Sequence, residues 1–73
     1  MKFIIFQPST NEFLAGFNSS PVSNLFRWTP HPSSAKTFKR RSQAIAFAAK
    51  FPHRDFVVCQ LIISGDFLKV TSI

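Results

Sequence analysis

The sequence predicts a small α+β fold: an antiparallel sheet of four to five strands with one α-helix packed on a face, in the order β-β-(β)-α-β-β. Three observations support this. Runs of β-branched and aromatic residues are separated by turn residues, and only one segment has a clear helical periodicity. The chain has 73 residues, which leaves room for a single domain, residues 1–73.

Two apolar runs joined by a turn predict a hairpin in the first part of the chain. Residues 2–6 and 13–17 are rich in β-branched and aromatic side chains, and residues 8–11 favour a turn. Both faces of the first run are largely apolar. We therefore expect this strand to be central in its sheet or covered on more than one side.

The middle of the chain alternates loops with short elements. Residues 18–24 are rich in asparagine, serine and proline, which predicts a polar and mobile surface loop. A short strand is predicted over residues 25–28. Pro32 is suited to begin one helical turn that ends at Lys36, after which Phe38 returns to the core.

The helix is predicted over residues 42–51, with Ser42 as its N-cap and Pro52 ending it. Apolar residues recur there at spacings of three and four, which indicates a core-facing stripe. The stripe contains Ala44, Phe47, Ala48 and Phe51, with Ile45 widening it, while Gln43, Ala46 and Lys50 point outward. The two alanines in the stripe allow the helix to lie close to a sheet.

Two further strands are predicted after the helix. Residues 55–63 are dense in apolar side chains and indicate a buried central strand. Residues 64–66 form a tight turn, and residues 67–73 alternate well enough to be the antiparallel partner.

Composition indicates a soluble, cytoplasmic protein with an aromatic core. Ten phenylalanines and one tryptophan supply large rings to a domain too small to bury much surface otherwise. Cys59 is the single cysteine, so no internal disulfide forms. The apolar run at residues 3–6 is too short for a signal peptide, and no run approaches the length of a membrane span. We expect no membrane association.

The charge is strongly basic and unevenly placed. Nine lysines and arginines against three acidic residues give a formal net charge of +6. Six of the nine fall within residues 36–54, which favours an anionic partner without distinguishing a polyanion from an acidic protein face. The alternative is a solvated face that only aids solubility.

Residues 39–42 give the strongest functional signal, because they place three cations where the helix begins. Cations are disfavoured at a helix N-terminus, so their presence suggests an anion-binding surface. The free amides, the Ser42 hydroxyl and two guanidinium groups would converge there. If Lys50 shares an outward face with Arg41, the basic patch extends along the whole helix. The candidate partner-binding residues are Lys36, Lys39, Arg40, Arg41, Ser42, Lys50, Arg54 and Trp28.

Trp28 has two interpretations. With Arg27 and His31 it would form an exposed stacking platform or a binding hot spot. The alternative is an anchor at the core or its rim, which is the commoner role of a lone tryptophan in a small domain.

The residues offer little for catalysis or metal binding. The one cluster with an acid and a base is Asp55 beside Arg54 and His53, and the chain has no paired acids at useful spacing. One cysteine and two distant histidines make a poor zinc set. We expect no enzymatic activity, no metal and no cofactor.

Part of the chain resembles small phage and prophage proteins of unassigned role. The resemblance lies in a W-T-x-x-P-x-x-A-K-x-F stretch, here Trp28 to Phe38, followed by a capped helix with A-x-x-F, here within residues 42–47. It covers about a third of the chain, and Pro30 and the high phenylalanine content depart from it. The resemblance implies a phage-encoded accessory protein, a class that includes host-takeover factors and anti-CRISPR inhibitors. It carries over no functional residues.

The leading hypothesis is a non-enzymatic inhibitor or adaptor. It would bind a host protein or protein–nucleic acid complex, such as a nucleic-acid enzyme or a CRISPR–Cas defence complex, through its basic helix face and block it. The alternative is direct binding of DNA or RNA phosphates through the same residues. Self-association as a homodimer through an exposed strand edge or a Phe patch is compatible with both.

Overall fold

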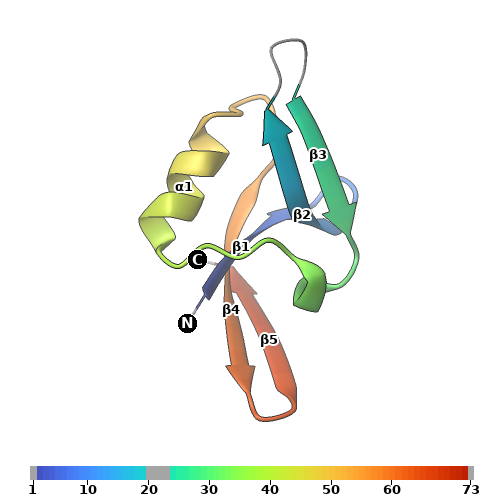
Figure 1. The fold of residues 1–73 in the computed structure, drawn as a ribbon, viewed down its shortest axis with the longest axis vertical. Helices are drawn as coiled ribbons and strands as arrows, with labels where there is room; N and C mark the ends of the chain where they lie inside the picture. The colour runs from blue at the N-terminus through green and yellow to red at the C-terminus, as the bar shows by residue number, and fades with distance from the viewer. Residues whose placement is uncertain (1, 20–23, 73) are drawn as a thin grey trace.

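A computed structural model describes residues 2–19 and 24–72 and confirms the predicted fold class (Figure 1). Five antiparallel strands form one sheet, and one α-helix covers one of its faces. The elements in chain order are β1 (Lys2–Gln7), β2 (Glu12–Ser19), β3 (Asn24–Thr29), the 3₁₀ turn η1 (Pro32–Ser34), α1 (Arg41–Ala49), β4 (Val57–Ser64) and β5 (Phe67–Ser72).

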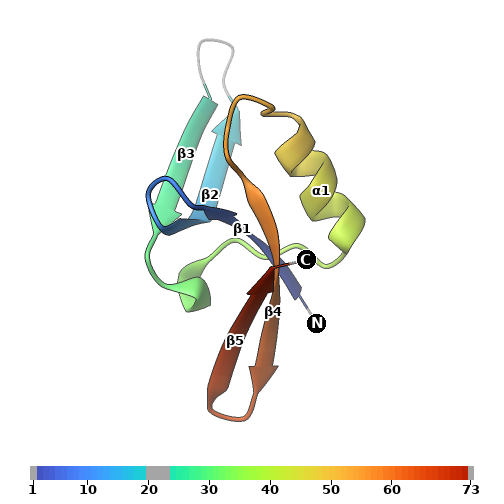
Figure 2. The same ribbon diagram turned by 180° about the vertical axis from the view of Figure 1, so that it is seen from behind.

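The strands lie in the order β3-β2-β1-β4-β5. β1, β2 and β3 follow one another as hairpins, and β4 and β5 form another hairpin on the far side of β1. Between β3 and β4 the chain passes through η1 and α1. α1 lies against β1 and β4 (Figures 1 and 2), whereas Ala35, directly after η1, packs with Ile4 on the opposite face of the sheet. The backbone amide of Lys36 donates to the carbonyl of Leu14 at 2.8 Å and fastens this connection to the sheet.

β1 is the central strand and is buried on both faces, as its two apolar faces predicted. Ile5 packs with the helix side of the sheet, together with Leu14, Ala44 and Phe47. Ile4 belongs to a second core on the opposite face, which it shares with Cys59 and Leu61. Ile4 and Ile5 are both fully buried, so neither face of this strand reaches solvent at these positions.

An aromatic cluster fills the space between α1 and the sheet. Phe47, which is 9% exposed, contacts the rings of Phe17, Phe38 and Phe51 at centroid distances of 5.2 to 5.6 Å. Phe26 continues the cluster, 5.1 Å from Phe51. These tilted and edge-on contacts are the geometries that aromatic pairs prefer, so the rings set how far the helix stands from the sheet.

The turns follow the predicted chemistry. Asn11 in the β1–β2 turn has φ 58°, a left-handed conformation that asparagine tolerates. Gly65 begins the two-residue turn between β4 and β5 with φ 57°, where glycine meets no steric cost. The predicted helical turn is present as η1, although it ends at Ser34 rather than at Lys36.

The helix boundaries correct the prediction. α1 begins at Arg41 with Arg40 as its N-cap, so Ser42 lies inside the helix and is not the N-cap. The Arg40 side chain has no acceptor to offer a free amide. Instead, the Arg40 backbone amide donates to the side-chain oxygen of Gln43 at 3.3 Å, which closes half of a capping box. At its other end α1 stops at Ala49 with Lys50 as C-cap, two residues before the predicted end at Phe51, so Pro52 follows the helix but is not the residue that directly ends it.

Two further expectations change. β4 is not a buried central strand along its length: it begins at Val57, and Ile62, Ile63 and Ser64 at its end are exposed. β2 and β3 extend into the predicted loop from both sides, as far as Ser19 and from Asn24. The remainder of that loop, residues 20–23, lies outside the described residues.

Candidate binding surface

The outward side of α1 carries almost no charge along its middle. Ala44 and Phe47 face the sheet and are buried, whereas Ile45 is 45% exposed. Successive helical residues are about 100° apart, so one solvent-facing strip gathers four exposed residues. We call this strip the outer helix face; it consists of Ser42, Ile45, Ala46 and Ala49. Ile45 therefore does not widen the core stripe, as predicted, but gives the outer helix face its largest apolar side chain.

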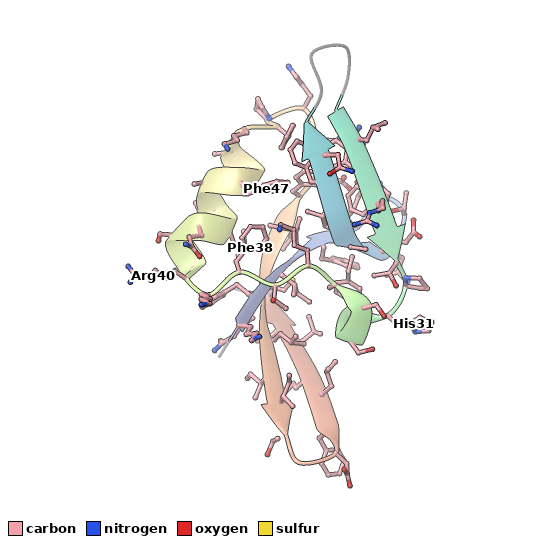
Figure 3. The ribbon with its side chains drawn as sticks, viewed as in Figure 1. His31, Phe38, Arg40 and Phe47 are labelled. Atoms are coloured by element: carbon pink, nitrogen blue, oxygen red, sulfur yellow. The ribbon has the colours of Figure 1, made fainter. Side chains whose placement is uncertain are left out.

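Three cations precede or begin the helix. This N-terminal basic cluster consists of Lys39, Arg40 and Arg41, all exposed. No acidic residue lies in the first turn to offset them. Arg40 extends away from the helix and from the body of the molecule (Figure 3). Each cation interacts unfavourably with the helix dipole, at a cost of roughly a few tenths of a kcal/mol. The stability of the fold therefore does not explain why they are placed here.

The predicted convergence of groups on one anion is not what the structure shows. Ser42 lies at the second helical position and belongs to the exposed outer helix face. Arg40 points into solvent (Figure 3). The N-terminal basic cluster is therefore an open charged patch beside the outer helix face.

A second group of basic residues lies where the helix ends. This C-terminal basic cluster consists of Lys50, His53 and Arg54, all exposed. The backbone amide of Arg54 donates to the carbonyl of Phe51 at 3.0 Å, so the chain turns back after Pro52. That turn places the guanidinium of Arg54 over the ring of Phe26, 4.8 Å from its centroid. A cation–π contact of this kind holds the charge in place without neutralising it.

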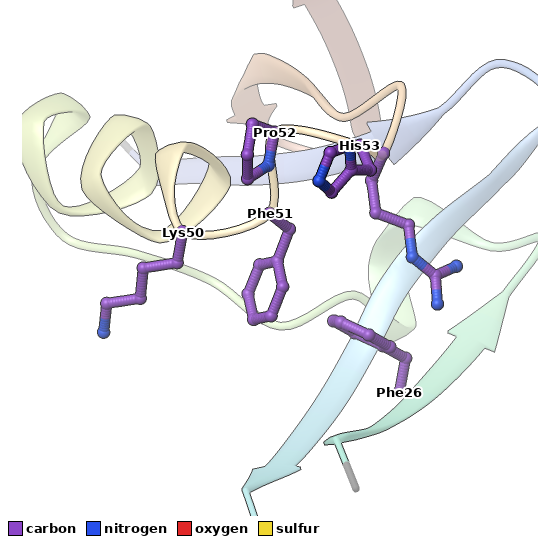
Figure 4. Close-up of a pocket in the computed structure, with 6 residues that line it drawn as sticks. Phe26, Lys50, Phe51, Pro52 and His53 are labelled. Atoms are coloured by element: carbon purple, nitrogen blue, oxygen red, sulfur yellow. The ribbon is translucent and has the colours of Figure 1, made fainter.

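A pocket of about 320 Å³ opens beside this second cluster (Figure 4). Its lining residues are Phe26, Lys50, Phe51, Pro52, His53 and Arg54. The rings supply an apolar floor and the basic side chains a cationic rim. The volume is at the small end of ligand pockets and suits a side chain or a small group that carries negative charge beside an apolar part.

The two basic clusters do not merge into one stripe. Arg41 and Lys50 are two and a half helical turns apart, which places them on opposite sides of the helix axis. α1 has nine residues and is about 13 Å long. The expected continuous basic patch is therefore replaced by two cationic ends with the uncharged outer helix face between them.

Two candidate residues lie away from these clusters. Lys36 is exposed in the connection before the helix, and its ammonium nitrogen lies 5.5 Å from the centroid of Phe38. Trp28 is half-buried in the aromatic cluster, 5.9 Å from Phe26 and 5.7 Å from Phe56. Trp28 thus packs as an anchor at the rim of the core.

The predicted stacking platform around Trp28 is not formed. Arg27 follows the opposite face of β3, where its guanidinium lies against Gly16 across the strand pair. The backbone amide of His31 donates to the Thr29 hydroxyl at 3.2 Å, and its exposed ring lies at the far side of the view from Arg40 (Figure 3).

The three acidic side chains lie elsewhere. Both carboxylate oxygens of Asp55 accept hydrogen bonds from Ser9, from its backbone amide at 2.7 Å and its hydroxyl at 3.2 Å. Glu12 begins β2 at the β1–β2 turn, and Asp66 lies at the tip of the β4–β5 hairpin. None belongs to α1 or to either basic cluster.

Reactive groups are sparse in the part of the chain that the structure describes. Burial raises the pKa of the Cys59 thiol, which keeps it protonated and unreactive at neutral pH. Within residues 2–19 and 24–72, no group of three or more histidine, cysteine or acidic side chains is placed to hold a metal ion. In the same ranges, no helix is long and apolar enough to cross a membrane.

Sequence reasoning missed the pocket and the exposure of Ile45. The pocket depends on the ring of Phe26, from β3, meeting the ring of Phe51, just after α1, and nothing in the local sequence signals that contact. The exposure of Ile45 had a signal, since it lies about 110° from the centre of the core-facing stripe on a helical projection.

Comparison with known proteins identifies no relative. No protein-family model matches the chain, and neither a curated protein nor a solved structure matches it.

Proposed function

We propose that the protein is a small non-enzymatic inhibitor or adaptor that docks α1 on the acidic-rimmed surface of another protein and blocks that surface. The observation that carries this proposal is the arrangement of the helix: exposed Ile45, Ala46 and Ala49 lie between two cationic ends. Protein interfaces have an apolar centre and a polar, charged rim, and this surface has that composition.

The partner's chemistry follows from that arrangement. It needs a shallow apolar patch about as long as α1, with carboxylates at both ends to meet the two basic clusters. An acidic or aromatic side chain of the partner would fit the pocket beside Phe26 and Phe51. The resemblance to phage accessory proteins favours a bacterial host protein in the host cytoplasm, such as a nucleic-acid enzyme or a defence complex.

Direct nucleic-acid binding is the second candidate, favoured by the exposed cations. α1 spans about four base-pair steps at 3.4 Å each, so its two ends would meet phosphates that are not adjacent. The outer helix face argues against this reading, because phosphates gain nothing from an isoleucine and two alanines. Phosphate contacts also predict a log affinity that falls with log salt at about −0.9 per phosphate neutralised.

The test is a quantitative pull-down from a nuclease-treated bacterial lysate. We expect the wild type to retain a protein that Arg40→Glu/Arg41→Glu and Ile45→Ser each fail to retain. Lys2→Glu/Arg27→Glu is the matched control, because it makes the same change in net charge at exposed cations outside α1. Retention of the same proteins by all four would refute the proposed surface.

A titration separates the second candidate. Random duplex and single strands are added to the wild type at low and at moderate salt. If the affinity for nucleic acid falls steeply with salt and is unchanged by Ile45→Ser, the second candidate is favoured over the protein partner. Absence of binding at low salt would remove that candidate.

A further inference from the structure

The pocket beside the C-terminal basic cluster has walls that are ordered before any ligand binds. The backbone amide of Phe51 donates to the carbonyl of Ala48 at 3.1 Å, and the amide of Arg54 donates to the carbonyl of Phe51 at 3.0 Å. The next residue, Asp55, accepts two hydrogen bonds from Ser9, which fasten this turn to the β1–β2 turn. A ligand would therefore lose little affinity to ordering the chain around it.

Two phenylalanine rings form the apolar part of the pocket (Figure 4). Phe26 and Phe51 are half-buried, and their centroids are 5.1 Å apart at an interplanar angle of 77°. Each ring also packs against Phe17 and Phe56, at centroid distances of 5.1 to 5.9 Å. The two rings are thus held from the core side while part of each stays exposed, which suits contact with another planar ring.

The charge around these rings is positive. Lys50 and Arg54 contribute two formal charges, and His53 adds a polar ring to the same rim. Among the described residues none of the three acidic side chains lines the pocket, and Asp55 accepts its hydrogen bonds from the β1–β2 turn. The guanidinium of Arg54 stacks 4.8 Å from the centroid of Phe26, and stacking leaves the N–H groups in its plane able to donate to an anion.

The end of α1 has an opposing effect on an anion. A helix C-terminus carries about half a negative charge, which attracts cations, so Lys50 and Arg54 would stabilise the helix end without any ligand. Their two formal charges exceed that half charge, however, and leave the pocket positive. Cations that only complement the helix dipole also need no exposed aromatic rings beside them, and this pocket combines the two.

We propose that this pocket binds an aromatic phosphate monoester, that is, a planar ring joined to a phosphate group. The ring packs on Phe26 and Phe51, and the phosphate accepts hydrogen bonds from Lys50 and Arg54. A phosphate monoester carries about −1.5 to −2 charges at pH 7, which matches two cations better than the single charge of a carboxylate does. The volume of about 320 Å³ limits the ligand to roughly one ring system and its phosphate.

The test is a titration of the purified full chain, followed through its backbone amide signals in two-dimensional NMR. Phenyl phosphate is the probe, and inorganic phosphate and phenol supply its two halves separately. We expect a dissociation constant for phenyl phosphate of about 1 mM or below, and binding at least about tenfold tighter than that of either half. The signals that shift most should be the amides of Phe26, Phe51 and Arg54.

Two double variants remove the same charge at opposite ends of α1. Lys50→Gln/Arg54→Gln should weaken the binding of phenyl phosphate roughly tenfold or more, because it removes the charge-assisted hydrogen bonds to the phosphate. Lys39→Gln/Arg40→Gln is the matched control, since both residues are exposed in the N-terminal basic cluster. It should leave the affinity within about twofold, because α1 is longer than the Debye length of about 8 Å at 0.15 M salt.

Two larger probes distinguish the possible sources of this chemistry. Adenosine 5′-monophosphate represents a nucleotide, and the amide of N-acetyl phosphotyrosine represents a modified protein side chain. The probe that binds more tightly, and that depends on Lys50 and Arg54, identifies the source, and either result supports the proposal. The binding is measured on this chain alone, so its failure is distinct from a failure to recover the proposed protein partner.

Three results would overturn the proposal. The first is a wild type that does not bind phenyl phosphate up to about 10 mM, which would leave Lys50 and Arg54 with their interaction with the helix end alone. The second is phenyl phosphate that binds no more tightly than inorganic phosphate. The third is an equal loss in the two double variants, which would indicate attraction to the net charge of the chain. The first two use the wild type, so they decide the matter even if a variant fails to fold.

Discussion

At the scale of single residues, Phe47 determines whether the helix stays on the sheet. It is nearly buried, and its ring contacts Phe17, Phe38 and Phe51. Phe47 is the one large side chain of α1 that is buried, since the other buried helical residue is Ala44. A large share of the stability therefore depends on one side chain.

Phe47→Ala should lower the free energy of unfolding by about 3 to 5 kcal/mol, through lost burial and the cavity left behind. That is comparable to the whole stability expected of 73 residues, about 4 to 11 kcal/mol. Urea denaturation measures the change. Ile45→Ala is the matched control, because Ile45 is exposed on the same helix and alanine favours a helix; a change below about 1 kcal/mol is expected. Equal losses in the two variants would contradict this role for Phe47.

Cys59 makes stability depend on pH in the alkaline range. Burial raises the pKa of its thiol, so the native state keeps a proton that the unfolded chain releases above about pH 8.5. The unfolded chain then binds fewer protons than the native chain, and the free energy of unfolding falls as pH rises. The stability of the wild type relative to Cys59→Ala should therefore fall between pH 7.5 and 9.5, as urea denaturation at the two pH values measures. A difference that is constant over this range would show that the thiol titrates normally.

At the scale of elements, α1 approaches the sheet closely because its contact positions alternate small and large residues. Ala44 is fully buried over β1, and Ala48 is half-buried beside it. The outward alanines, Ala46 and Ala49, have no such constraint. The same residue type therefore has two roles in one short helix.

Ala44→Leu should destabilise the protein by about 1 to 3 kcal/mol, because the added methyl groups would push α1 away from the sheet. Ala46→Leu places the same side chain in solvent and should change the free energy of unfolding by less than about 0.5 kcal/mol. Thermal unfolding of the two variants gives the comparison. If Ala46→Leu were the more damaging, the orientation of α1 described here would be wrong.

The local sequence patterns predicted where the strands and the helix lie better than they predicted which of their residues are buried. The β1–β2 hairpin, the β4–β5 hairpin and the helix were all predicted, because turn residues and periodicity act within a few positions. The burial of β4 was not, because it depends on how far the pairing with β1 extends: among the described residues β1 pairs with β4 only from Val57 to Leu61, and residues as apolar as Ile62 and Ile63 are exposed.

The candidate site was likewise predictable where it depends on local sequence and not where it depends on contacts between distant segments. The positions of the cations near the helix ends were predictable from the sequence, since charged residues are rarely buried. The separation of Arg41 from Lys50 also had a signal that the prediction overlooked, because nine residues of helix place two side chains on opposite sides of its axis. The pocket beside Phe26 needs strands and helix in place before it exists.

At the scale of the whole molecule, three regions have different surface chemistry. The body holds the aromatic cluster, α1 presents an apolar strip between cationic ends, and the outer part of the β4–β5 hairpin, residues 62–69, presents exposed apolar side chains with no net charge. The molecule is elongated, with principal extents of 42, 23 and 20 Å, and the β4–β5 hairpin projects from the body (Figure 1).

The central claim is that the outer helix face contributes apolar contact to binding and that the cations do not act alone. The most direct measurement is the affinity of Ile45→Ser, relative to the wild type, for the partner recovered from the lysate. We predict at least a tenfold loss of affinity in a variant that circular dichroism shows to be folded, because Ile45 is the largest exposed apolar side chain of the outer helix face. An unchanged affinity would contradict the claim, since a surface acting through charge alone does not need this side chain.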